Sequence, residues 1–449
     1  MQPAALQLPA ASPTPAPTAD PAPGAALAPA AAPVSAEFRV NTTIAGRQEN
    51  SSITRLKGGG HVIAWISSSE FYDGTSIPAD TQGVCTQRYG VDGAALGQET
   101  CRAPEAVFLS KPALAALEDG GYLLVWPVRQ TDGAGFDHNL FAQRFDASGA
   151  PVRAVQQINS TTLSSYLYPT IAAAGLADGG YVVTWGAAAP LQTNRDIYAR
   201  RFDADGAPCP CGAEKRVNTL VSSSNLITRS DPAVAALADG GYVVTWAGTG
   251  QRAFTGTAIY AQRYGAQNSP IGPEAILTPD TSGDLLGASS PAVSGLAGGG
   301  YAVAYFLARG QTVPVIAVQS FRSDGTVLAA QSAVNPLLAP LPTCTRLGAV
   351  GPCPRPVASP AVAALDDGGF VVVFNEGIGP AATESYARRY GANGAPTGDP
   401  TQLASGFQPA VSGTSQGGFM LSLQHFDGNG DGIFARYFGA LPIDRNTAP

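Results

Sequence analysis

The stretch Leu237-Ala-Asp-Gly-Gly-Tyr-Val-Val-Thr-Trp246 decides the fold of this 449-residue chain, because close copies of it recur along the whole sequence. A small apolar run, Pro232 to Leu237, leads into the turn, and a β-branched and aromatic run, Tyr242 to Trp246, follows it. Glycines accept the positive φ angles that tight hairpin turns require, and β-branched and aromatic residues favour strands. The stretch therefore predicts two strands joined by an Asp-Gly-Gly turn.

Seven copies of this hairpin are present, and similar sequence follows each of them. A variable loop leads to a third strand, such as Ile259-Tyr-Ala-Gln-Arg-Tyr264, and a short turn leads to a fourth strand that ends in Val-Asn, as Glu214 to Asn218 does. Repeats of this size stack into one body, so we predict one large domain. The copies of the turn and the strand after it are Lys57 to Trp65, Asp119 to Trp126, Asp178 to Trp185, Asp239 to Trp246, Gly298 to Tyr305, Asp367 to Phe374 and Gln416 to Leu423.

The last repeat stops after its third strand, whereas Glu37 to Asn41, near the start of the chain, matches the end of a repeat. Pairing the two would complete the last repeat and remove open sheet edges. The sequence thus predicts an all-β fold, a seven-bladed β-propeller of four-stranded blades over residues 37–440, closed by its N-terminal strand. A linear solenoid, the alternative, would need polar caps, and neither end resembles one. Residues 1–36, rich in Ala and Pro, are interpreted as a disordered spacer, and residues 441–449 as a C-terminal tail.

Composition narrows the possible partners. Hydrophobic residues make up 45% of the chain and charged residues 13%, with 53 Gly and 37 Pro, which is typical of many short strands joined by turns. The net charge of −7 gives no basic surface for phosphate backbones or anionic membranes, which argues against nucleic acid as a partner. No stretch is apolar for long enough to span a bilayer. We expect a monomer.

The cysteines fall into three pairs that are local in sequence: Cys85 with Cys101, Cys209 with Cys211, and Cys344 with Cys353. Such pairs predict disulfides and an oxidising location, which would be secreted, periplasmic or on the cell surface. Zinc is the rival interpretation, but the pairs lie in different repeats and only three histidines are present. We expect the first pair to cross-link the third and fourth strands of the first blade. The second pair closes so small a ring that partial reduction is expected.

The repeat resembles one found in large secreted and surface proteins of bacteria, often beside calcium-binding or adhesin modules. The resemblance rests on the Asp-Gly-Gly-aromatic…Trp hairpin, on the Ile-Tyr-Ala-Gln-Arg strand that starts at Ile259, and on the closing Val-Asn. It covers roughly residues 37 to 440 and implies an extracellular propeller-like module with no shared catalytic set. The fifth repeat (Val318 to Phe321) and the seventh (Ala435 to Phe438) depart from the pattern in the third strand.

An arginine recurs at one position of the third strand, and an aspartate recurs in the hairpin turn. A ring of arginines could grip an anion. A residue repeated in most blades is more often a structural partner for the repeat's own aspartate or carbonyl groups, and we interpret both sets in that way. They are Arg88, Arg144, Arg201, Arg263 and Arg389, with Asp119, Asp178, Asp239 and Asp367.

The connections within each hairpin and between its third and fourth strands are short, whereas those between second and third strands and between repeats vary. In a propeller the two long classes emerge on one face, here called the long-loop face, and such variation marks where function is carried. Aromatic rings stack on sugars or protein surfaces, and short polar side chains fix orientation. An ordinary hydrophilic rim is the alternative. The candidate ligand-binding residues are Tyr72, Asp73, Asp132, Phe136, His138, Tyr166, Tyr168, Arg252 and Phe254.

These features predict a secreted or surface-displayed binding or adhesion module that recognises a glycan or a protein through the long-loop face. The alternative is a polysaccharide-acting glycoside hydrolase or lyase, because one fold hosts both functions. No catalytic set is identified. Sialidase propellers carry Ser-x-Asp-x-Gly-x-Thr-Trp, of which Asp239 to Trp246 shares only the ending, and Gly-x-Ser-x-Gly is absent. A pair of perturbed carboxylates at the channel mouth would favour the enzyme.

Asp427-Gly-Asn-Gly-Asp-Gly432 alternates oxygen-bearing side chains with glycines, a spacing that suits a hard cation such as calcium. The ligands would be Asp427, Asn429 and Asp431. The match is incomplete, because integrin-type loops place an acidic residue where Ala435 stands. A plain turn is the alternative. Bound calcium would have a dissociation constant on the order of 10⁻⁴ to 10⁻³ M.

Overall fold

The computed structural model describes most of the chain as strands and short turns. Among the described residues, no helix is long and apolar enough to cross a membrane. The predicted spacer and tail lie outside the described residues, apart from residues 32–36, and so remain predictions. The described residues are 32–44, 46–68, 83–102, 110–131, 136–160, 163–164, 169–188, 195–211, 213–219, 229–249, 256–278, 285–309, 314–335, 343–346, 349–352, 357–377, 383–414, 417–428 and 430–439.

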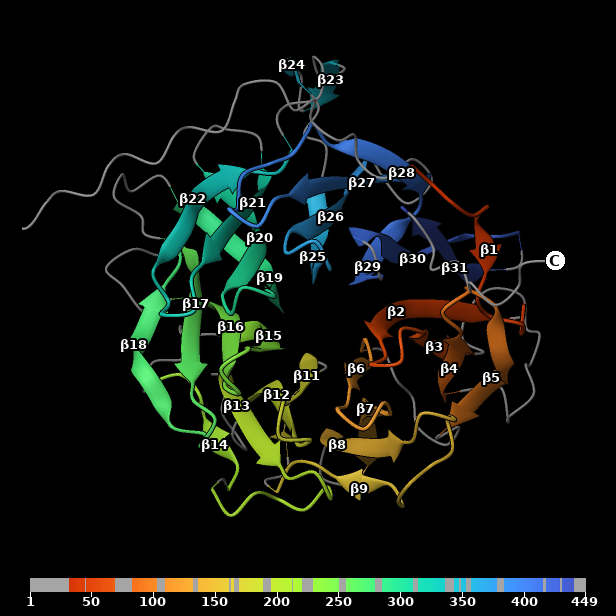
Figure 1. Ribbon diagram of the computed structural model, residues 1–449. Helices are drawn as coiled ribbons and strands as arrows, with labels where there is room; N and C mark the ends of the chain where they lie inside the picture. Colours follow the sequence, from red (N-terminus) through yellow and green to blue (C-terminus); the bar gives the residue numbers. More distant parts are fainter. Residues whose placement is uncertain are drawn as a thin grey trace, which may run out of the picture.

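Seven antiparallel sheets follow one another along the chain and lie in a ring, as Figure 1 shows. Each sheet is one blade, and its first strand lies nearest the centre. A separate hairpin of β23 (Thr343–Arg346) and β24 (Ala349–Pro352) stands between the fifth and sixth blades in sequence. The blade strands are β2 (Arg47–Arg55), β3 (His61–Ser68), β4 (Gly83–Tyr89) and β5 (Ala95–Arg102); β6 (Ala113–Ala116), β7 (Tyr122–Thr131), β8 (Phe136–Phe145) and β9 (Gln156–Gln157), with β10 (Leu163–Ser164) also beside β8; β11 (Ile171–Gly175), β12 (Tyr181–Ala188), β13 (Arg195–Phe202) and β14 (Lys215–Arg216); β15 (Arg229–Ala236), β16 (Tyr242–Thr249), β17 (Thr257–Tyr264) and β18 (Pro270–Ile276); β19 (Leu285–Gly295), β20 (Tyr301–Arg309), β21 (Val315–Phe321) and β22 (Val327–Ala333); β25 (Val357–Ala364), β26 (Phe370–Gly377), β27 (Thr383–Tyr390) and β28 (Thr401–Ser405); and β29 (Phe407–Gly413), β30 (Phe419–Phe426) and β31 (Asp431–Phe438), completed by β1 (Phe38–Arg39).

The N-terminal strand closes the ring. β1 pairs with β31, with Phe38 opposite Ala435, so a strand from the start of the chain completes the seventh blade (Figure 1). The contact begins earlier than the repeat predicts, because the Gly439 N–H donates to the Ala32 carbonyl at 3.0 Å. The seven-bladed propeller with N-terminal closure, expected from the sequence, is confirmed.

In five blades an asparagine or a threonine after the fourth strand caps the outermost pairing. In the third blade the Ile197 N–H donates to Asn218 Oδ1 at 2.8 Å. At the closure the Ile433 N–H donates to Asn41 Oδ1, also at 2.8 Å. The seam is therefore bonded in the same way as an internal blade. The equivalent acceptors in the second, fourth and fifth blades are Asn159, Thr278 and Asn335.

Each residue of the Asp-Gly-Gly turn meets a separate requirement. In the fourth blade, Asp239 Oδ1 accepts the N–H of Gly241 at 2.9 Å. Gly240 has a φ of 80°, in the left-handed region that costs other residues about 1–2 kcal/mol. A Cβ on Gly241 would lie 2.1 Å from the carbonyl oxygen of Tyr264 on the third strand. The second glycine is equally constrained at Gly121, Gly180, Gly300 and Gly369.

Aromatic residues fill the space within and between the blades. Trp65, Trp126, Trp185 and Trp246 are all buried on the second strands. At the start of the same strands an aromatic ring stacks on the last ring of the third strand, as Tyr242 does on Tyr264 at 4.8 Å. Neighbouring blades cover both faces of the sheet, which is why every residue of β26 is buried.

The first blade has a histidine where the others have an aromatic ring. His61 is 2% exposed, and its Nε2 donates to the Gly413 carbonyl of the seventh blade at 3.1 Å. Burial lowers the pKa of His61 to about 4, which the hydrogen bond opposes and nearby Arg55 assists. The imidazole is therefore neutral in the folded protein at neutral pH.

Small residues on the innermost strands allow those strands to contact one another around the axis. Three glycines end alternate innermost strands, and each faces a backbone carbonyl of the preceding blade. A Cβ would lie 2.0 Å from the Ala116 oxygen at Gly175, 2.1 Å from the Ala236 oxygen at Gly295 and 2.3 Å from the Ala364 oxygen at Gly413. A larger side chain would push the blades apart.

The recurring arginines are structural, as their repetition predicts. Arg144 Nη2 lies 2.7 Å from Asp119 Oδ2 in the turn of its own blade. Arg88, in the first blade, donates instead to the Ala147 carbonyl of the second blade at 2.5 Å. The arginines thus tie the third strand to a hairpin turn or to the next blade. The pairing with the turn aspartate recurs as Arg201 with Asp178, Arg263 with Asp239 and Arg389 with Asp367.

Two of the three predicted disulfides are present among the described residues. Cys85 and Cys101 face each other on β4 and β5 and are bonded, as expected. Cys209 and Cys211 are also bonded. Cys353 lies outside the described residues, so its pairing with Cys344 of β23 stays a prediction.

Candidate functional site

Most of the predicted ligand-binding residues lie on the long connections, outside the described residues. Phe136 is the first residue of β8. His138 follows in the same strand and is buried, with 4% exposure, so it belongs to the blade and not to an exposed loop. Outside the described residues are Tyr72, Asp73, Asp132, Tyr166, Tyr168, Arg252 and Phe254.

Four innermost strands share an irregularity near the long-loop face. At equivalent points the pairing with the second strand shifts, and a polar, partly exposed residue adopts left-handed backbone. Such residues cost about 1–3 kcal/mol each and cluster at functional sites. Because the blades repeat, the four occupy equivalent positions on innermost strands, and we call them the polar ring. They are Asn50 (φ 60°), Asp231 (φ 53°), Ser290 (φ 52°) and Gln408 (φ 52°).

The preceding blade holds two members of the polar ring in place. The Asn50 N–H donates to Gln424 Oε1 of the seventh blade at 3.2 Å. The Asp231 N–H donates to Thr170 Oγ1 of the third blade at 3.3 Å. These bonds satisfy amides that the irregular pairing would otherwise leave without acceptors. The Asn50 and Asp231 side chains stay partly exposed.

A charged cluster lies beside Asn50, where the first blade meets the seventh. Arg47 Nη2 lies 2.9 Å from Glu49 Oε2 and 3.4 Å from Asp431 Oδ2, so the two carboxylate oxygens are at most 6.3 Å apart. Glu49 is 8% exposed. Burial raises the pKa of Glu49; Arg47 opposes that shift and the Asp431 carboxylate adds to it. The two carboxylates thus share one guanidinium, and the Glu49 side chain is the more buried of the two.

A second cluster lies near Asp231, where the third blade meets the fourth. Arg229 is 1% exposed, and its Nη1 lies 2.8 Å from Asp196 Oδ1. Burial lowers the pKa of neighbouring Arg195, and the Asp231 carboxylate opposes that shift. Guanidinium groups and carboxylates therefore lie together where the third blade meets the fourth.

Lys111 adds an amine in the second blade. It precedes Pro112 as Asp231 precedes Pro232, so it stands at the position of the polar ring. Its side chain is exposed to solvent. At neutral pH it is cationic and can donate to hydroxyl or anionic groups.

The predicted calcium loop is only partly described. Asp427 Oδ2 lies 2.7 Å from Arg39 Nη2 with the aspartate buried, and Asp431 is paired with Arg47. Asn429 lies outside the described residues. Within the part of the chain that the structure describes, no three His, Cys, Asp or Glu side chains gather as metal ligands. A cation would have to compete with two arginines, and calcium binding stays a prediction.

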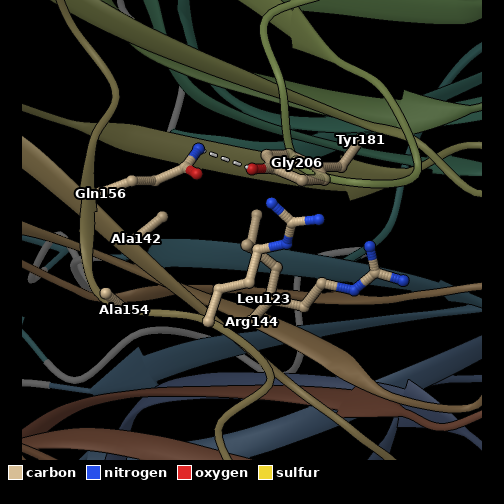
Figure 2. Close-up of a pocket in the computed structure, with 8 residues that line it drawn as sticks. Leu123, Ala142, Arg144, Ala154, Gln156, Tyr181 and Gly206 are labelled. Atoms are coloured by element: carbon tan, nitrogen blue, oxygen red, sulfur yellow. Dashed lines mark hydrogen bonds between the residues drawn. The ribbon is translucent and has the colours of Figure 1, made fainter.

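Figure 2 shows a crevice between the second and third blades, lined by Leu123, Ala142 and Arg144 among others. Its volume is about 10 Å³, room for about one water molecule. Across it Gln156 Nε2 donates to Tyr181 Oη at 2.9 Å. The crevice is a packing gap between blades and not a ligand site.

Comparison with known proteins supports the fold and leaves the family open. No protein-family model matches the chain, and no curated protein is similar enough in sequence to count as a relative. A solved polysaccharide lyase, an ulvan lyase of family PL25, matches with a TM-score of 0.53 and 9% identity, over 90% of this chain and 96% of that one. A protein of unknown function from Dyadobacter fermentans matches with a TM-score of 0.50 and 12% identity, over 92% and 100%. At these identities the likeness shows a shared propeller fold alone.

The sequence analysis did not single out the polar ring, Glu49 or Lys111. A signal for the ring is present in the sequence, because proline follows Asp231, Ser290 and Gln408 at the start of an innermost strand. Proline cannot donate to the sheet ladder, so its recurrence near a strand start indicates an interruption of pairing. No comparable signal marks Glu49, whose environment depends on Asp431 at the other end of the chain.

Proposed function

We propose that this protein is an extracellular glycan-binding propeller, of the kind found in bacterial surface proteins, that holds its ligand over the channel mouth on the long-loop face. The observation that carries the proposal is the polar ring. A strained backbone at equivalent places in four blades is retained where side chains must be placed accurately. The Cys85–Cys101 and Cys209–Cys211 disulfides support an oxidising location.

The channel mouth offers the groups that sugar recognition uses. The polar ring supplies amides at Asn50 and Gln408, a carboxylate at Asp231 and a hydroxyl at Ser290, which are donors and acceptors for sugar hydroxyls. Lys111 adds a cation suited to carboxylated or sulfated sugars. The predicted loop aromatics, Tyr72, Phe136, Tyr166, Tyr168 and Phe254, would stack on sugar rings.

A glycan array that includes acidic polysaccharides tests the proposal. The ulvan lyase with the same fold has been solved bound to -[GlcA(1-4)Rha3S]-, which makes acidic glycans the first class to screen. Asn50→Gly and Asp231→Gly then remove a ring side chain and keep the left-handed backbone that glycine tolerates. We expect each to weaken binding about tenfold, or about 1.4 kcal/mol.

Asp205→Gly is the matched control, because Asp205 is an exposed turn residue on the opposite face. Its affinity should equal that of the unchanged protein. The proposal fails if the array shows no glycan bound, or if the ring variants bind as tightly as Asp205→Gly.

The carboxylate pair favours a second function, hydrolysis of the bound glycan. An oxygen separation of at most 6.3 Å between Glu49 and Asp431 allows the about 5–5.5 Å between carboxyl groups of retaining glycosidases. Glu49, with its raised pKa, would protonate the glycosidic oxygen, and the Asp431 carboxylate would attack the anomeric carbon.

Release of reducing ends or of a chromogenic aglycone tests this second function. Glu49→Gln should abolish product formation and leave binding largely unchanged, whereas Glu118→Gln, in an exposed ion pair with Lys57, should change neither. Binding of a glycan by the unchanged protein without any product would refute hydrolysis and leave the binding function standing.

A further inference from the structure

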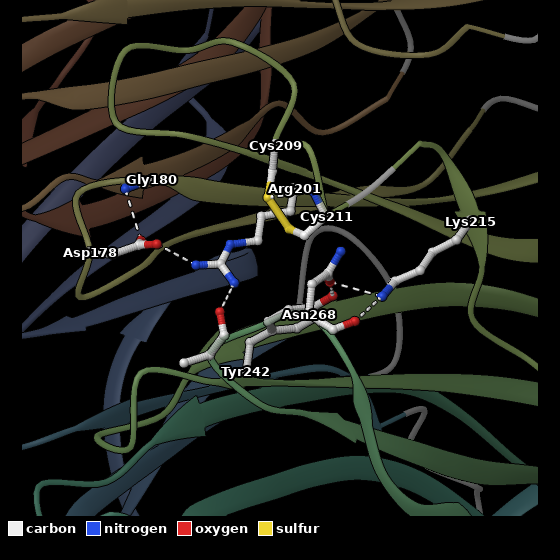
Figure 3. Close-up of a disulfide and its surroundings, with 9 residues drawn as sticks. Asp178, Gly180, Arg201, Cys209, Cys211, Lys215, Tyr242 and Asn268 are labelled. Atoms are coloured by element: carbon white, nitrogen blue, oxygen red, sulfur yellow. Dashed lines mark hydrogen bonds and ion pairs between the residues drawn. A yellow bond between two sulfur atoms is a disulfide. The ribbon is translucent and has the colours of Figure 1, made fainter.

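A cavity on the opposite face contains the Cys209–Cys211 disulfide. The bond closes over Pro210 alone, in the turn between β13 and β14. The cavity has a volume of about 420 Å³, within the range of small-molecule sites. Figure 3 shows the disulfide beside the Arg201 side chain, and both cysteines and Arg201 line the cavity. Asp178 and Asp203 are the acidic residues among the cavity-lining residues.

The two described disulfides have different surroundings. Cys85 is fully buried in the core between the first and seventh blades, and Cys101 packs against that core. Cys211 is exposed and Cys209 is partly exposed. Exchange requires a thiolate to reach one sulfur, so the exposed pair can react while the buried pair is protected.

We propose that Cys209–Cys211 is a thiol–disulfide exchange site for low-molecular-weight thiols, at which Cys211 is attacked and Cys209 leaves. Cys211 is the more exposed of the two. Cys209 Sγ accepts the N–H of Cys211 at 3.2 Å, and Arg201 is the cation among the cavity-lining residues. The Cys211 N–H favours a thiolate on Cys209, which makes Cys209 the better leaving group, and the Arg201 guanidinium adds positive charge to a cavity that also holds the Asp178 and Asp203 carboxylates. Arg201 also pairs with Asp178, which holds the guanidinium in position.

The exchange proceeds in two steps. The incoming thiolate attacks Cys211 Sγ, the bond to Cys209 breaks with its electron pair on Cys209, and a mixed disulfide forms on Cys211. A second thiolate attacks the small-molecule sulfur of that mixed disulfide and releases Cys211 as a thiolate. Two small thiols are thereby oxidised to one disulfide, the protein disulfide gains two electrons, and the two protons pass to Cys209 and Cys211.

Glutathione redox buffers of graded ratio test the site, with acid quenching, differential alkylation and peptide mapping of each cysteine pair. Cys85–Cys101 is the internal control. We expect half of the Cys209–Cys211 disulfide to be reduced at a ratio of reduced to oxidised glutathione at least about tenfold lower than the ratio that half reduces Cys85–Cys101. The glutathione adduct trapped early should map to Cys211. Opening of both disulfides at one ratio, or an early adduct on Cys209, would overturn the proposal.

Arg201→Gln tests the role of the guanidinium. In the reduced protein it should raise the thiol pKa of Cys209, seen as a several-fold slower alkylation of that residue at pH 7. Arg144→Gln removes the equivalent arginine from the second blade and should leave the alkylation rate unchanged. Equal effects of the two variants would show that Arg201 acts only through blade packing and would refute the stabilised leaving group.

Discussion

Replacing Asn41 by alanine tests the closure of the propeller at a single side chain. Asn41 is 2% exposed, and the Ile433 N–H that it accepts belongs to a fully buried residue. Alanine leaves that N–H without its acceptor, which costs about 1–3 kcal/mol. The bond from Asn41 Nδ2 to the Thr43 carbonyl, 2.7 Å long, is lost as well, at about 0.5–1.5 kcal/mol. We expect a total loss of about 1.5–4.5 kcal/mol, a large part of the about 5–15 kcal/mol that stabilises a typical domain.

Equilibrium urea unfolding, followed by tryptophan fluorescence, measures this loss. Asn335→Ala is the matched control, because Asn335 makes the same bond to the Ile316 N–H within the fifth blade. Both variants should lower the free energy of unfolding, with Asn41→Ala at least as severe. A normal stability for Asn41→Ala beside a destabilised Asn335→Ala would show that the seam does not hold the ring together.

Three other predictions concern pH, the hairpin turn and calcium. The pKa of His61 is about 4 in the folded protein and 6.5 in the unfolded chain. Its neutral, buried imidazole therefore contributes about 3 kcal/mol to the free energy of unfolding above pH 6.5, and this contribution is lost as the pH falls towards 4. His61→Phe should remove that part of the pH dependence in urea unfolding; an unchanged slope would contradict the burial argument. Gly240→Ala should lower the free energy of unfolding by about 1–2 kcal/mol. Gly241→Ala should lower it further, because its methyl group would collide with a carbonyl oxygen. A lower thermal midpoint for Gly240→Ala than for Gly241→Ala would contradict this account of the turn. Millimolar calcium should release heat on titration and raise the melting temperature, and Asp427→Ala should abolish both; no heat from the unchanged protein would leave the loop a plain turn.

The fold could be predicted because the residues that define each blade interact mainly with other residues of the same repeat. The Asp239-Gly-Gly turn, the ring stacked on Tyr264 and the closing asparagine depend on partners within one blade, and the pattern is repeated seven times. The closure was also predictable, since Glu37 to Asn41 is a fourth strand without its repeat. The first and last residues of the individual strands were harder to predict. β1 and β14 contain only two residues each, although backbone bonds continue just beyond them, where the Val40 and Val217 N–H groups donate to the Ile433 and Ile197 carbonyls.

The candidate site was harder to predict because it is assembled between blades. Glu49 and Asp431 are 382 positions apart and meet only when the ring closes on Arg47. Variable loops directed the prediction to the long connections and not to the innermost strands, whose side chains looked like ordinary strand residues.

The pairing of Ala32 with Gly439 has a mechanical consequence. β1 and β31 run antiparallel, so Ala32 and Gly439 lie at the same end of that pair. Tension applied between Ala32 and Gly439 would therefore break the hydrogen bonds of the seam one after another, starting at Gly439, instead of loading all of them at once. The seventh blade should therefore yield at low force. In a surface protein, this joint would be the point at which traction first opens the ring.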